Sequence, residues 1–450
     1  MKFLIYTEFG EISDLGIYLQ EVEKHEVVLH IHDSGSRKIA EGILEHVTDW
    51  HRYMGKGYIW VFDSCSFGDL QDWLREKGES VIGGCKKGDE LENDRQLGQK
   101  WFKDSGFDQV ESHNFSDFDE AIEFVKKHND RRWIMKQNGS APKSLSHAGK
   151  FDDGIDMLFH LEESKKGWNE LQYGKVDFDL MEIVEGLEVG ACCYFNGSDW
   201  MRMDGKVVGY LNFEEKKESD GGLGETCGEM GTTFFGCTEE NELFREIICK
   251  PAIKSRLKSI GFRGFFDINC IVTDEGKIVA LEPTCRFGIP ATSYELLRGL
   301  ESGAGNLLEA VAKGLNRPIK VHQGWGLVMV VVAKPFPVEA DLDDSATSMD
   351  EKLWILDNGV PVEEFSADQR QHIHLYNFMK DEDGYKVATK NGYLLTVTMN
   401  GGEIAEIREK LIEYIKDNIF ISGMKYRSDI GLRVEEYEKE MENVPSQEED

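Results

Sequence analysis

The sequence predicts an α/β protein of about three domains, because the chain has 450 residues and a single domain rarely exceeds about 200. Residues 1–90 alternate short apolar strands with helical patterns, which is typical of a parallel sheet covered by helices. Antiparallel strands follow in the middle of the chain, and a second strand-and-helix segment follows them. The predicted division is an N-terminal parallel α/β domain over 1–92, a central domain over 93–320, a C-terminal α/β domain over 321–433 and an acidic tail over 434–450.

The first third of the chain supplies the elements of the parallel sheet. The predicted strands are Lys2–Tyr6, Val27–Ile31, Tyr58–Phe62 and Ser80–Ile82, and the amphipathic helices between them are Leu15–Glu23 and Ser36–Val47. Residues 91–130 look helical on both sides of Gly106. A strand, Arg132–Lys136, then ends in a loop of polar and small residues.

The rest of the chain mixes antiparallel strands with helices. The predicted helices are 153–163, Glu240–Ile260 and Ile404–Ile419; the predicted strands are Met181–Phe195, Lys206–Phe213, Phe265–Thr273, Lys277–Glu282, Gly326–Ala333 and Tyr393–Met399. The glycine-rich stretch Ser219–Gly236 is predicted to be a long functional loop. From Val434 onward the charged composition predicts a frayed tail.

Charge and composition exclude several classes of function. The chain carries 84 acidic and 52 basic residues, a formal net charge of −32. This balance argues against a protein that coats nucleic acid or docks on an anionic membrane, because both rely on Lys and Arg. Its apolar stretches are too short for a membrane span or a signal peptide. The nine cysteines, without C-x-x-C spacing, favour reduced thiols in the cytoplasm.

The hairpin around residues 265–284 is the most informative segment for chemistry. Alternate residues of a strand share a face, so Asp267 lies with Asn269, and Glu282 lies with Thr284 on the partner strand. Side-by-side oxygen ligands suit Mg²⁺. The alternative is a pair of solvated polar strand faces.

Other candidates point to an anionic ligand. Lys136 ends an apolar strand, and Lys143 lies in the loop after it, where lysines could meet phosphates. The glutamates Glu182 and Glu188 flank a strand edge that could hold a purine and its ribose. The glycines between 221 and 231 let the backbone approach a ligand, and Arg286 could hold a carboxylate bidentately. Each of these signals is weak alone.

Taken in order, these segments resemble the glycinamide ribonucleotide synthetase (phosphoribosylamine–glycine ligase) family of ATP-grasp ligases. The stretch Leu281–Gly288 looks like that family's metal strand and arginine turn, and Gly224–Gly231 looks like its glycine-rich substrate loop. Ile134–Lys136 with its loop is similar to the family's ATP lysine and phosphate loop. Tyr426–Arg433 closely matches its C-terminal signature, and the resemblance covers about residues 1–433.

The resemblance implies a central ATP-grasp fold with a lid subdomain over about 112–190, and a role for each candidate. ATP would be bound by Arg95, Lys136, Lys143, Glu182, Ile183, Val184 and Glu188; the metal by Glu282, Asn269 and Thr284; and the substrate by Lys216, Thr226, Gly228, Met230, Gly231 and Arg286, with Lys136 and Arg286 as catalytic residues. The implied cofactors are ATP and Mg²⁺, with Mn²⁺ as an alternative metal. The implied substrates are a small amine and a carboxylate, with glycine expected.

Three departures from the family pattern concern the metal and the amine. Thr284 stands where the family has Asn, and Ile289-Pro290-Ala291 replaces acidic residues. The first-strand turn Thr7-Glu8-Phe9-Gly10-Glu11 replaces a phosphate-binding turn, and its two carboxylates would repel a phosphoribosyl phosphate. The ATP half of the site therefore looks kept and the amine half altered.

Three functions remain open from the sequence. The first is an ATP-dependent carboxylate–amine ligase of purine biosynthesis that forms an amide through an acyl phosphate, with release of ADP and phosphate. The second is an ATP-grasp ligase that joins a different amine and acid. The third is a nucleotide-binding protein without turnover. The expected assembly is a monomer or a homodimer, without nucleic-acid or membrane partners.

Overall fold

The computed structural model describes residues 1–137, 146–171, 175–337 and 342–443. Within these ranges the chain forms two compact units. The larger unit contains residues 1–89, 189–268 and 283–450, and the smaller unit contains residues 90–188 and 269–282. The predicted division into three domains stays a prediction.

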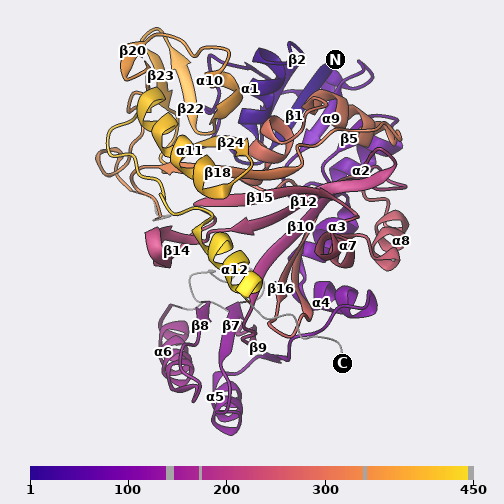
Figure 1. Cartoon of the computed structure of the whole chain (residues 1–450), viewed down its shortest axis with the longest axis vertical. Coiled ribbons are helices and arrows are strands. Elements are labelled where there is room, and N and C mark those ends of the chain that lie inside the picture. The colour runs from indigo at the N-terminus through magenta and orange to yellow at the C-terminus, as the bar shows by residue number, and fades with distance from the viewer. Residues whose placement is uncertain (138–145, 172–174, 338–341, 444–450) are drawn as a thin grey trace. The chain divides into compact units, whose positions relative to one another are not determined.

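A five-stranded parallel sheet opens the larger unit, in the strand order β3-β2-β1-β4-β5 (Figure 1). Its strands are β1 (Lys2–Thr7), β2 (Glu26–Ile31), β3 (Glu45–His46), β4 (Ile59–Phe62) and β5 (Ser80–Ile82), and all neighbours are parallel. Strands β1, β2 and β4 are buried along nearly their whole length, as expected for a sheet covered on both faces. The predicted strands of this segment are confirmed.

The helices of this segment were predicted only in part. Helix α1 (Ser13–Glu21) confirms the first, and α2 (Gly68–Glu76) precedes β5. The second prediction, a helix over Ser36–Val47, is wrong: these residues form successive turns that end in β3. Gly42 lies in this stretch with φ of +75°, a left-handed conformation that interrupts a helix.

The second sheet of the larger unit is mainly antiparallel. Its strand order is β17-β16-β10-β12-β15-β18-β24-β21, and neighbours from β10 to β21 run antiparallel. The strands are β10 (Leu187–Phe195), β12 (Lys206–Glu214), β15 (Gly231–Thr238), β16 (Gly264–Val272), β17 (Ile278–Thr284), β18 (Gly324–Val332), β21 (Ile373–Leu375) and β24 (Tyr393–Gly401). The chain of the hairpin β16–β17 continues into the smaller unit.

The centre of this sheet is covered on both faces. Helix α11 (Ile404–Asn418) packs against β18 and β24, and the helical segment η4 (Ser293–Arg298) packs against the same two strands. The ring of Tyr294 in η4 lies directly on the backbone of β18, because a Cβ at Gly326 would be 1.9 Å from Tyr294 Cζ. The apolar run that predicted a buried strand at Gly326–Ala333 is thereby explained.

Two long predictions in the middle of the chain are corrected by breaks in the backbone. Met181–Phe195 is two strands, β9 (Phe178–Glu182) and β10, with Gly186 at φ +149° between them. Glu240–Ile260 is two helices, α7 (Glu242–Ile248) and α8 (Pro251–Ser259), because Pro251 can begin a helix but cannot continue one.

The predicted functional loop Ser219–Gly236 is mostly strand. It contains a short hairpin, β13 (Lys217–Ser219) with β14 (Leu223–Thr226), and then β15. The glycines had indicated a loop, but Gly231 and Gly236 are needed where β15 lies close to other backbone. A Cβ at Gly236 would be 1.9 Å from the carbonyl oxygen of His322.

The smaller unit has its own sheet, in the order β6-β9-β7-β8. Its elements are α3 (Lys86–Asn93, which begins in the larger unit), α4 (Arg95–Asp104), β6 (Ser112–Phe115), α5 (Phe118–Lys127), β7 (Trp133–Gln137), β8 (His147–Ala148), α6 (Ile155–Leu171) and β9. Strand β6 lies in a region predicted to be entirely helical. These residues form a strand because they pair with β9, and the hydropathy pattern of residues 112–115 alone does not reveal that contact.

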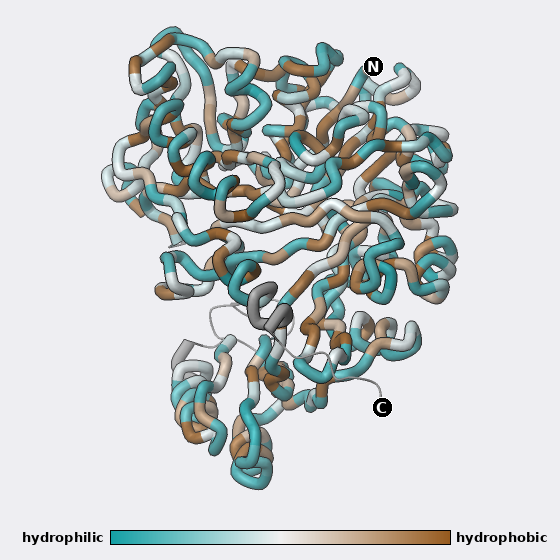
Figure 2. Tube along the Cα trace, in the orientation of Figure 1, coloured by the Kyte–Doolittle hydropathy of each residue, from teal (hydrophilic) through white to brown (hydrophobic). Residues whose placement is uncertain are grey.

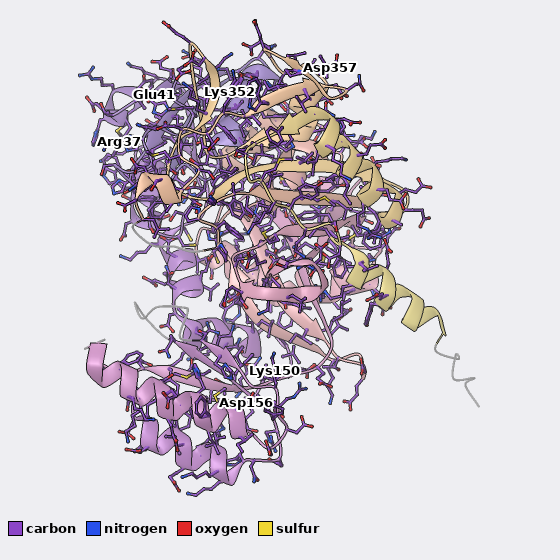
Figure 3. All side chains as sticks on the ribbon, turned by 90° about the vertical axis from the view of Figure 1, so that its left-hand side faces the viewer. Arg37, Glu41, Lys150, Asp156, Lys352 and Asp357 are labelled. Atoms are coloured by element: carbon purple, nitrogen blue, oxygen red, sulfur yellow. The ribbon has the colours of Figure 1, made fainter. Side chains whose placement is uncertain are left out.

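Helices α5 and α6 cover a core built on Trp133, Met135 and Phe178. Teal and brown residues alternate along both helices in Figure 2, as expected for helices with one buried face. At the start of α6 the backbone N–H of Lys150 donates to Asp156 Oδ2 at 2.5 Å, and the two residues lie together in Figure 3.

The C-terminal part of the larger unit adds small sheets and two helices. The small sheets are β20-β19-β25, formed by β19 (Trp354–Asp357), β20 (Val360–Val362) and β25 (Ile419–Phe420), and β22-β23, formed by β22 (Phe378–Asp381) and β23 (Gly384–Val387). The frayed tail predicted from Val434 onward is instead helical to residue 443, as α12 (Leu432–Asn443). In the described ranges no helix is both long and apolar enough to cross a membrane.

Candidate functional site

Lys136 lies near the end of β7 in the smaller unit, as predicted. Its antiparallel partner on β9 is Asp179, which is 3% exposed and accepts a hydrogen bond from Asn114 Nδ2 at 2.9 Å. Lys136 itself is half-buried. Strand pairing thus fixes the backbone of Lys136. Gln137 follows it, and residues 138–145, which include Lys143, lie outside the described residues.

Arg95 begins helix α4, directly after Asp94 caps the helix by accepting from the N–H of Leu97. Its guanidinium lies on β9, where Nη1 is 3.8 Å from the sulfur of Met181. Its Nε is buried without a hydrogen-bond partner. Arg95 therefore keeps donor capacity beside the strand that ends in Glu182.

Glu182 forms an ion pair with a cation of the same unit, Arg131. Arg131 Nη1 is 3.5 Å from Glu182 Oε1 and 2.9 Å from Glu111 Oε2. The N–H of Ile183 donates to the carbonyl of Arg132 at 3.0 Å, so this backbone donor is already used. The other residues of the predicted purine edge come next in the chain. They are Val184 and Glu188, and Glu188 is half-buried near the start of β10.

Gly186 lets this connection lie close to β16. A Cβ at Gly186 would be 2.2 Å from the carbonyl oxygen of Val272, and its φ is +149°. A side chain at this position would push residues 182–188 away from the hairpin. The glycine therefore sets the distance between the predicted purine edge and the predicted metal strands within the smaller unit.

Two of the three predicted metal ligands lie in the smaller unit. Asn269 on β16 is 6% exposed, and Glu282 on the neighbouring strand β17 is exposed. Thr284 ends β17 and shares its face with Glu282, since the two are alternate residues of one strand. Across the described ranges, no three His, Cys, Asp or Glu side chains form a group that could hold a metal ion. The predicted set of one carboxylate, one amide and one hydroxyl stays a prediction.

The predicted substrate residues divide into exposed and buried ones. Thr226 and Gly228 are exposed, and Lys216 Nζ lies 2.9 Å from Glu214 Oε2. Met230, in contrast, is 1% exposed and packs with Val330 and Val332.

Gly231 is buried as well, and a Cβ there would be 2.5 Å from the carbonyl oxygen of Val328. The side chain of Met230 is part of the core, because it is buried against Val330 and Val332. Of the predicted substrate residues in this segment, Thr226 and Gly228 are the exposed ones.

The C-terminal signature holds this substrate segment. Arg427, only 3% exposed, donates to both oxygens of Asp429 at 2.8 Å and to the carbonyl of Lys217 at 3.1 Å. Asp429 in turn accepts from the N–H of Gly221 at 2.7 Å, and the N–H of Ser428 donates to Asp220 at 2.8 Å. We call residues 427–429 with these partners the arginine clamp. Its role could not be derived from the sequence, because its partners lie about 200 positions away.

Carboxylates gather at the C-terminal ends of β1 and β4. Asp63 is fully buried and accepts from Thr7 Oγ1, and the Glu8 carboxylate accepts from Ser66 Oγ at 2.9 Å. Burial and the nearby Glu11 raise the pKa of Asp63 to about 8. Burial also raises the pKa of Glu11, an effect that Arg286 opposes and Glu8 reinforces.

Strand order reverses between β1 and β4, which is where open α/β sheets bind ligands. Asp63 thus lies close to the two turn residues Glu8 and Glu11, and the sequence had not indicated it as part of this group. Arg286, whose Nη1 donates to the carbonyl of Phe287 at 3.0 Å, lies within electrostatic reach of Glu11.

The chain is similar in sequence to ligases of purine biosynthesis. The phosphoribosylamine–glycine ligase of Haemophilus influenzae is 23% identical over 384 residues, which cover 82% of this chain and 80% of that protein. The trifunctional purine biosynthetic protein adenosine-3 of Drosophila melanogaster is 24% identical over 380 residues, and the chain spans 26% of its length. No protein-family model matches the chain.

Solved structures show the same fold. The phosphoribosylamine–glycine ligase of Thermotoga maritima superposes with a TM-score of 0.70 at 18% identity, covering 96% of this chain and 100% of that one. A biotin carboxylase of Campylobacter jejuni, solved with an ATP analogue, has a TM-score of 0.62 at 10% identity, covering 98% and 96%. The predicted fold class and the predicted resemblance are confirmed, and the low identities mark a divergent relative.

Proposed function

We propose that this divergent relative of the phosphoribosylamine–glycine ligases is an ATP-dependent carboxylate–amine ligase. The observation that carries the proposal is sequence similarity over 82% of this chain and 80% of the phosphoribosylamine–glycine ligase of Haemophilus influenzae. The identities are low, so the activity rests on the retained residues and not on the likeness alone.

The reaction proceeds in two balanced steps. A carboxylate oxygen of the acid attacks the γ-phosphorus of ATP, the bond between that phosphorus and the β–γ bridging oxygen breaks, and ADP leaves. The amine nitrogen then attacks the acyl carbon, the carbon–oxygen bond to phosphate breaks, and the amine proton leaves with the phosphate. The protein contributes positioning and charge neutralisation, without a covalent nucleophile.

The residue roles in the proposal are those of the resemblance. ATP is held by Arg95, Lys136, Lys143, Glu182, Ile183, Val184 and Glu188; the acid and amine by Lys216, Thr226, Gly228, Met230, Gly231 and Arg286. Asn269 and Glu282, on neighbouring strands, offer the oxygen donors that Mg²⁺ prefers, with Thr284 beside them. When bound, Mg²⁺ would neutralise phosphate charge, and Mn²⁺ could replace it. The proposal includes a cytoplasmic monomer or homodimer without nucleic-acid or membrane partners.

The decisive experiment measures ADP release from ATP, glycine and a panel of amines. Lys136→Ala and Glu282→Ala should each lower turnover more than about 100-fold, because each removes charge stabilisation of the transferred phosphoryl group. Lys277→Ala and Glu275→Ala, at the exposed turn of the same hairpin, are the matched controls and should retain activity. Wild-type turnover in either test variant would refute the proposal, and ATP binding without ADP from any pair would favour a binding protein.

A second candidate, a ligase for a different amine, is favoured by the carboxylates of the first sheet. Glu8, Glu11 and Asp63 stand where a phosphoribosyl phosphate would need cations and N–H donors. The amine panel should therefore include a phosphoribosyl ligand, and we expect it to bind weakly. Tight binding of that ligand would return the assignment to phosphoribosylamine.

A further inference from the structure

The interior of the larger unit contains a group of polar side chains that the proposed roles do not use. Asn212 and Glu214 come from β12, Asp267 from β16, Glu295 from η4, and Glu229 from the residues just before β15. We call these five residues the acidic cluster. Four of them are nearly inaccessible: Asn212 is 2% exposed, Glu229 5%, Asp267 6% and Glu295 0%.

The sheet is built so that two of these residues meet across an intervening strand. Strand β10 separates β12 from β16, and its residue opposite Asn212 is Gly190. A Cβ at Gly190 would be 2.2 Å from Asn212 Oδ1, so the amide passes over the glycine. It then donates from Nδ2 to Asp267 Oδ2 at 2.8 Å. This arrangement requires glycine at position 190.

The acidic cluster has more acceptors than donors. Asn212 Oδ1, Asp267 Oδ1, Glu229 Oε1 and Glu295 Oε2 are all buried without a hydrogen-bond partner. Thr232 Oγ1, paired across the strands with Glu214, is buried and unpartnered as well. Each unpaired buried acceptor destabilises the folded protein, because it has lost its hydrogen bonds to water. An occupant that brings several N–H donors would remove these costs together.

Electrostatics also favour a positive occupant. Burial, reinforced by Glu214, raises the pKa of Glu229 well above its ordinary value, while Lys216 opposes the rise. Burial and the nearby Asp267 raise the pKa of Glu295 in the same way. Lys216 Nζ lies 2.9 Å from Glu214 Oε2, so this cation meets the cluster at its partly exposed member. A cation in the interior would stabilise the whole group.

The acidic cluster reaches solvent at one side. The Glu214 side chain is 21% exposed and the Lys216 side chain 32% exposed. The exposed residues Thr226 and Gly228 belong to the segment predicted to bind substrate, and Glu229 follows them directly. The chain therefore passes from exposed residues of the predicted substrate segment directly to a buried carboxylate of the acidic cluster.

We propose that the acidic cluster binds the protonated amino group of the amine substrate and that the Glu229 carboxylate takes one proton from it, which frees the nitrogen lone pair for attack on the acyl carbon. The second proton leaves with the phosphate, and the substrate is a small cationic amine without a phosphate group of its own. The inference rests on the proposed ligase function and names its amine class. A primary ammonium brings three N–H donors and one positive charge, which match the unpaired oxygens. A phosphate would instead add negative charge to four carboxylates.

Binding of methylammonium chloride and of ethylenediamine dihydrochloride tests the inference directly. Thermal unfolding of the wild type should shift upward with either amine, compared with NaCl at equal ionic strength. Glu229→Gln should weaken the apparent affinity about tenfold or more, because it removes a charge-assisted acceptor. The matched control Glu240→Gln, an exposed carboxylate just beyond β15, should bind as the wild type does.

Folding of the variant is checked in the same experiment. Glu229→Gln without ligand should unfold at the wild-type temperature or above it, because a buried unpaired carboxylate is costly. If that variant does not fold, Glu295→Gln takes its place with the same expectation. Equal amine shifts in the wild type and in both cluster variants, or no shift in the wild type, would overturn the inference. So would a larger shift with MgCl₂ alone than with amine.

An ATP arm separates this inference from the proposed function. An ATP-induced shift and ADP release with glycine and any amine, without an amine shift that depends on Glu229, leaves the ligase standing and removes the cation site. An amine shift without ADP release from any acid–amine pair removes the ligase function, and the substrate role of the acidic cluster with it. Methylamine-dependent ADP release whose KM rises about tenfold and whose kcat falls in Glu229→Gln, because the variant lacks both the charge and the proton acceptor, supports both.

Discussion

At the scale of single residues, burial decides which ionisable groups depart from their ordinary pKa. His374 on β21 is 3% exposed, and its Nε2 lies 2.8 Å from Thr398 Oγ1. Burial, with His372 and Arg298 nearby, lowers the pKa of His374 from 6.5 to about 3. The folded protein therefore holds this ring neutral at pH values where the unfolded chain would protonate it.

The pH dependence of stability should carry the signature of this histidine. Because the folded pKa lies below the unfolded one, the contribution is fully present above pH 6.5 and is lost as pH falls toward 3. Well below pH 6.5 each unit of pH should cost about 1.4 kcal/mol of unfolding free energy. Between about pH 6.5 and 5.5 the cost is about 1 kcal/mol, because the unfolded ring is only partly protonated there. Urea unfolding of His374→Gln between about pH 6.5 and 5.5 should give a shallower slope by that amount. Parallel curves for the two proteins would contradict the assignment.

At the scale of elements, the C-terminal signature, residues 426–433, holds the distant β13–β14 hairpin by hydrogen bonds. The arginine clamp connects residues 427–429 to both ends of the segment 217–221. Arg433 adds a contact to Glu215 at 3.3 Å. These contacts support the β13–β14 hairpin from a distant part of the chain.

Removal of the clamp should be costly. Arg427→Met leaves Asp429 and Glu215 without their buried cation, and we expect a loss of about 3–5 kcal/mol of unfolding free energy. Arg433→Met is the control, because Arg433 is 40% exposed and such pairs contribute about 1 kcal/mol or less. The comparison is made by urea unfolding. Equal losses in the two variants would show that burial of Arg427 is not what matters.

At the scale of the whole molecule, the net charge of −32 acts on stability and on ligands. Like charges repel one another in the compact state, and salt screens this repulsion over a Debye length of about 10 Å at 0.1 M. The proposed ligands include ATP, which is itself anionic. Local cations such as Arg95, Lys136 and Arg286 must therefore offset the repulsion between the net negative charge of the protein and the anionic ATP.

Salt should stabilise the protein. Raising NaCl from about 10 mM to about 300 mM should raise the midpoint of thermal unfolding, because screening relieves the acidic self-repulsion. Exposed ion pairs such as Lys2–Glu26, at 3.0 Å, weaken in salt, but each contributes about 1 kcal/mol or less. A midpoint that falls steadily with salt would mean that ion pairs outweigh the net charge.

Sequence reasoning succeeded where the signal is local. The strands of the first sheet, Lys136 near a strand end and the hairpin at Asn269 and Glu282 follow from apolar periodicity and turn residues. It failed at β6, which depends on a partner strand, and at the glycines of β15, which suggested a loop but serve close backbone contact. The purine-edge and metal ligands remain predictions, because side-chain geometry toward a ligand is not a local property.

The sequence by itself determined the strands of the first sheet, the family resemblance and the unusual carboxylates Glu8 and Glu11. Only the tertiary structure decided which distant residues meet. Asp63 joins the first-strand carboxylates, Arg427 holds a hairpin 200 positions away, and Asn212 reaches Asp267 over Gly190. The physical reason is that sheet order and register set such contacts, and both arise from packing of the whole chain rather than from any one segment.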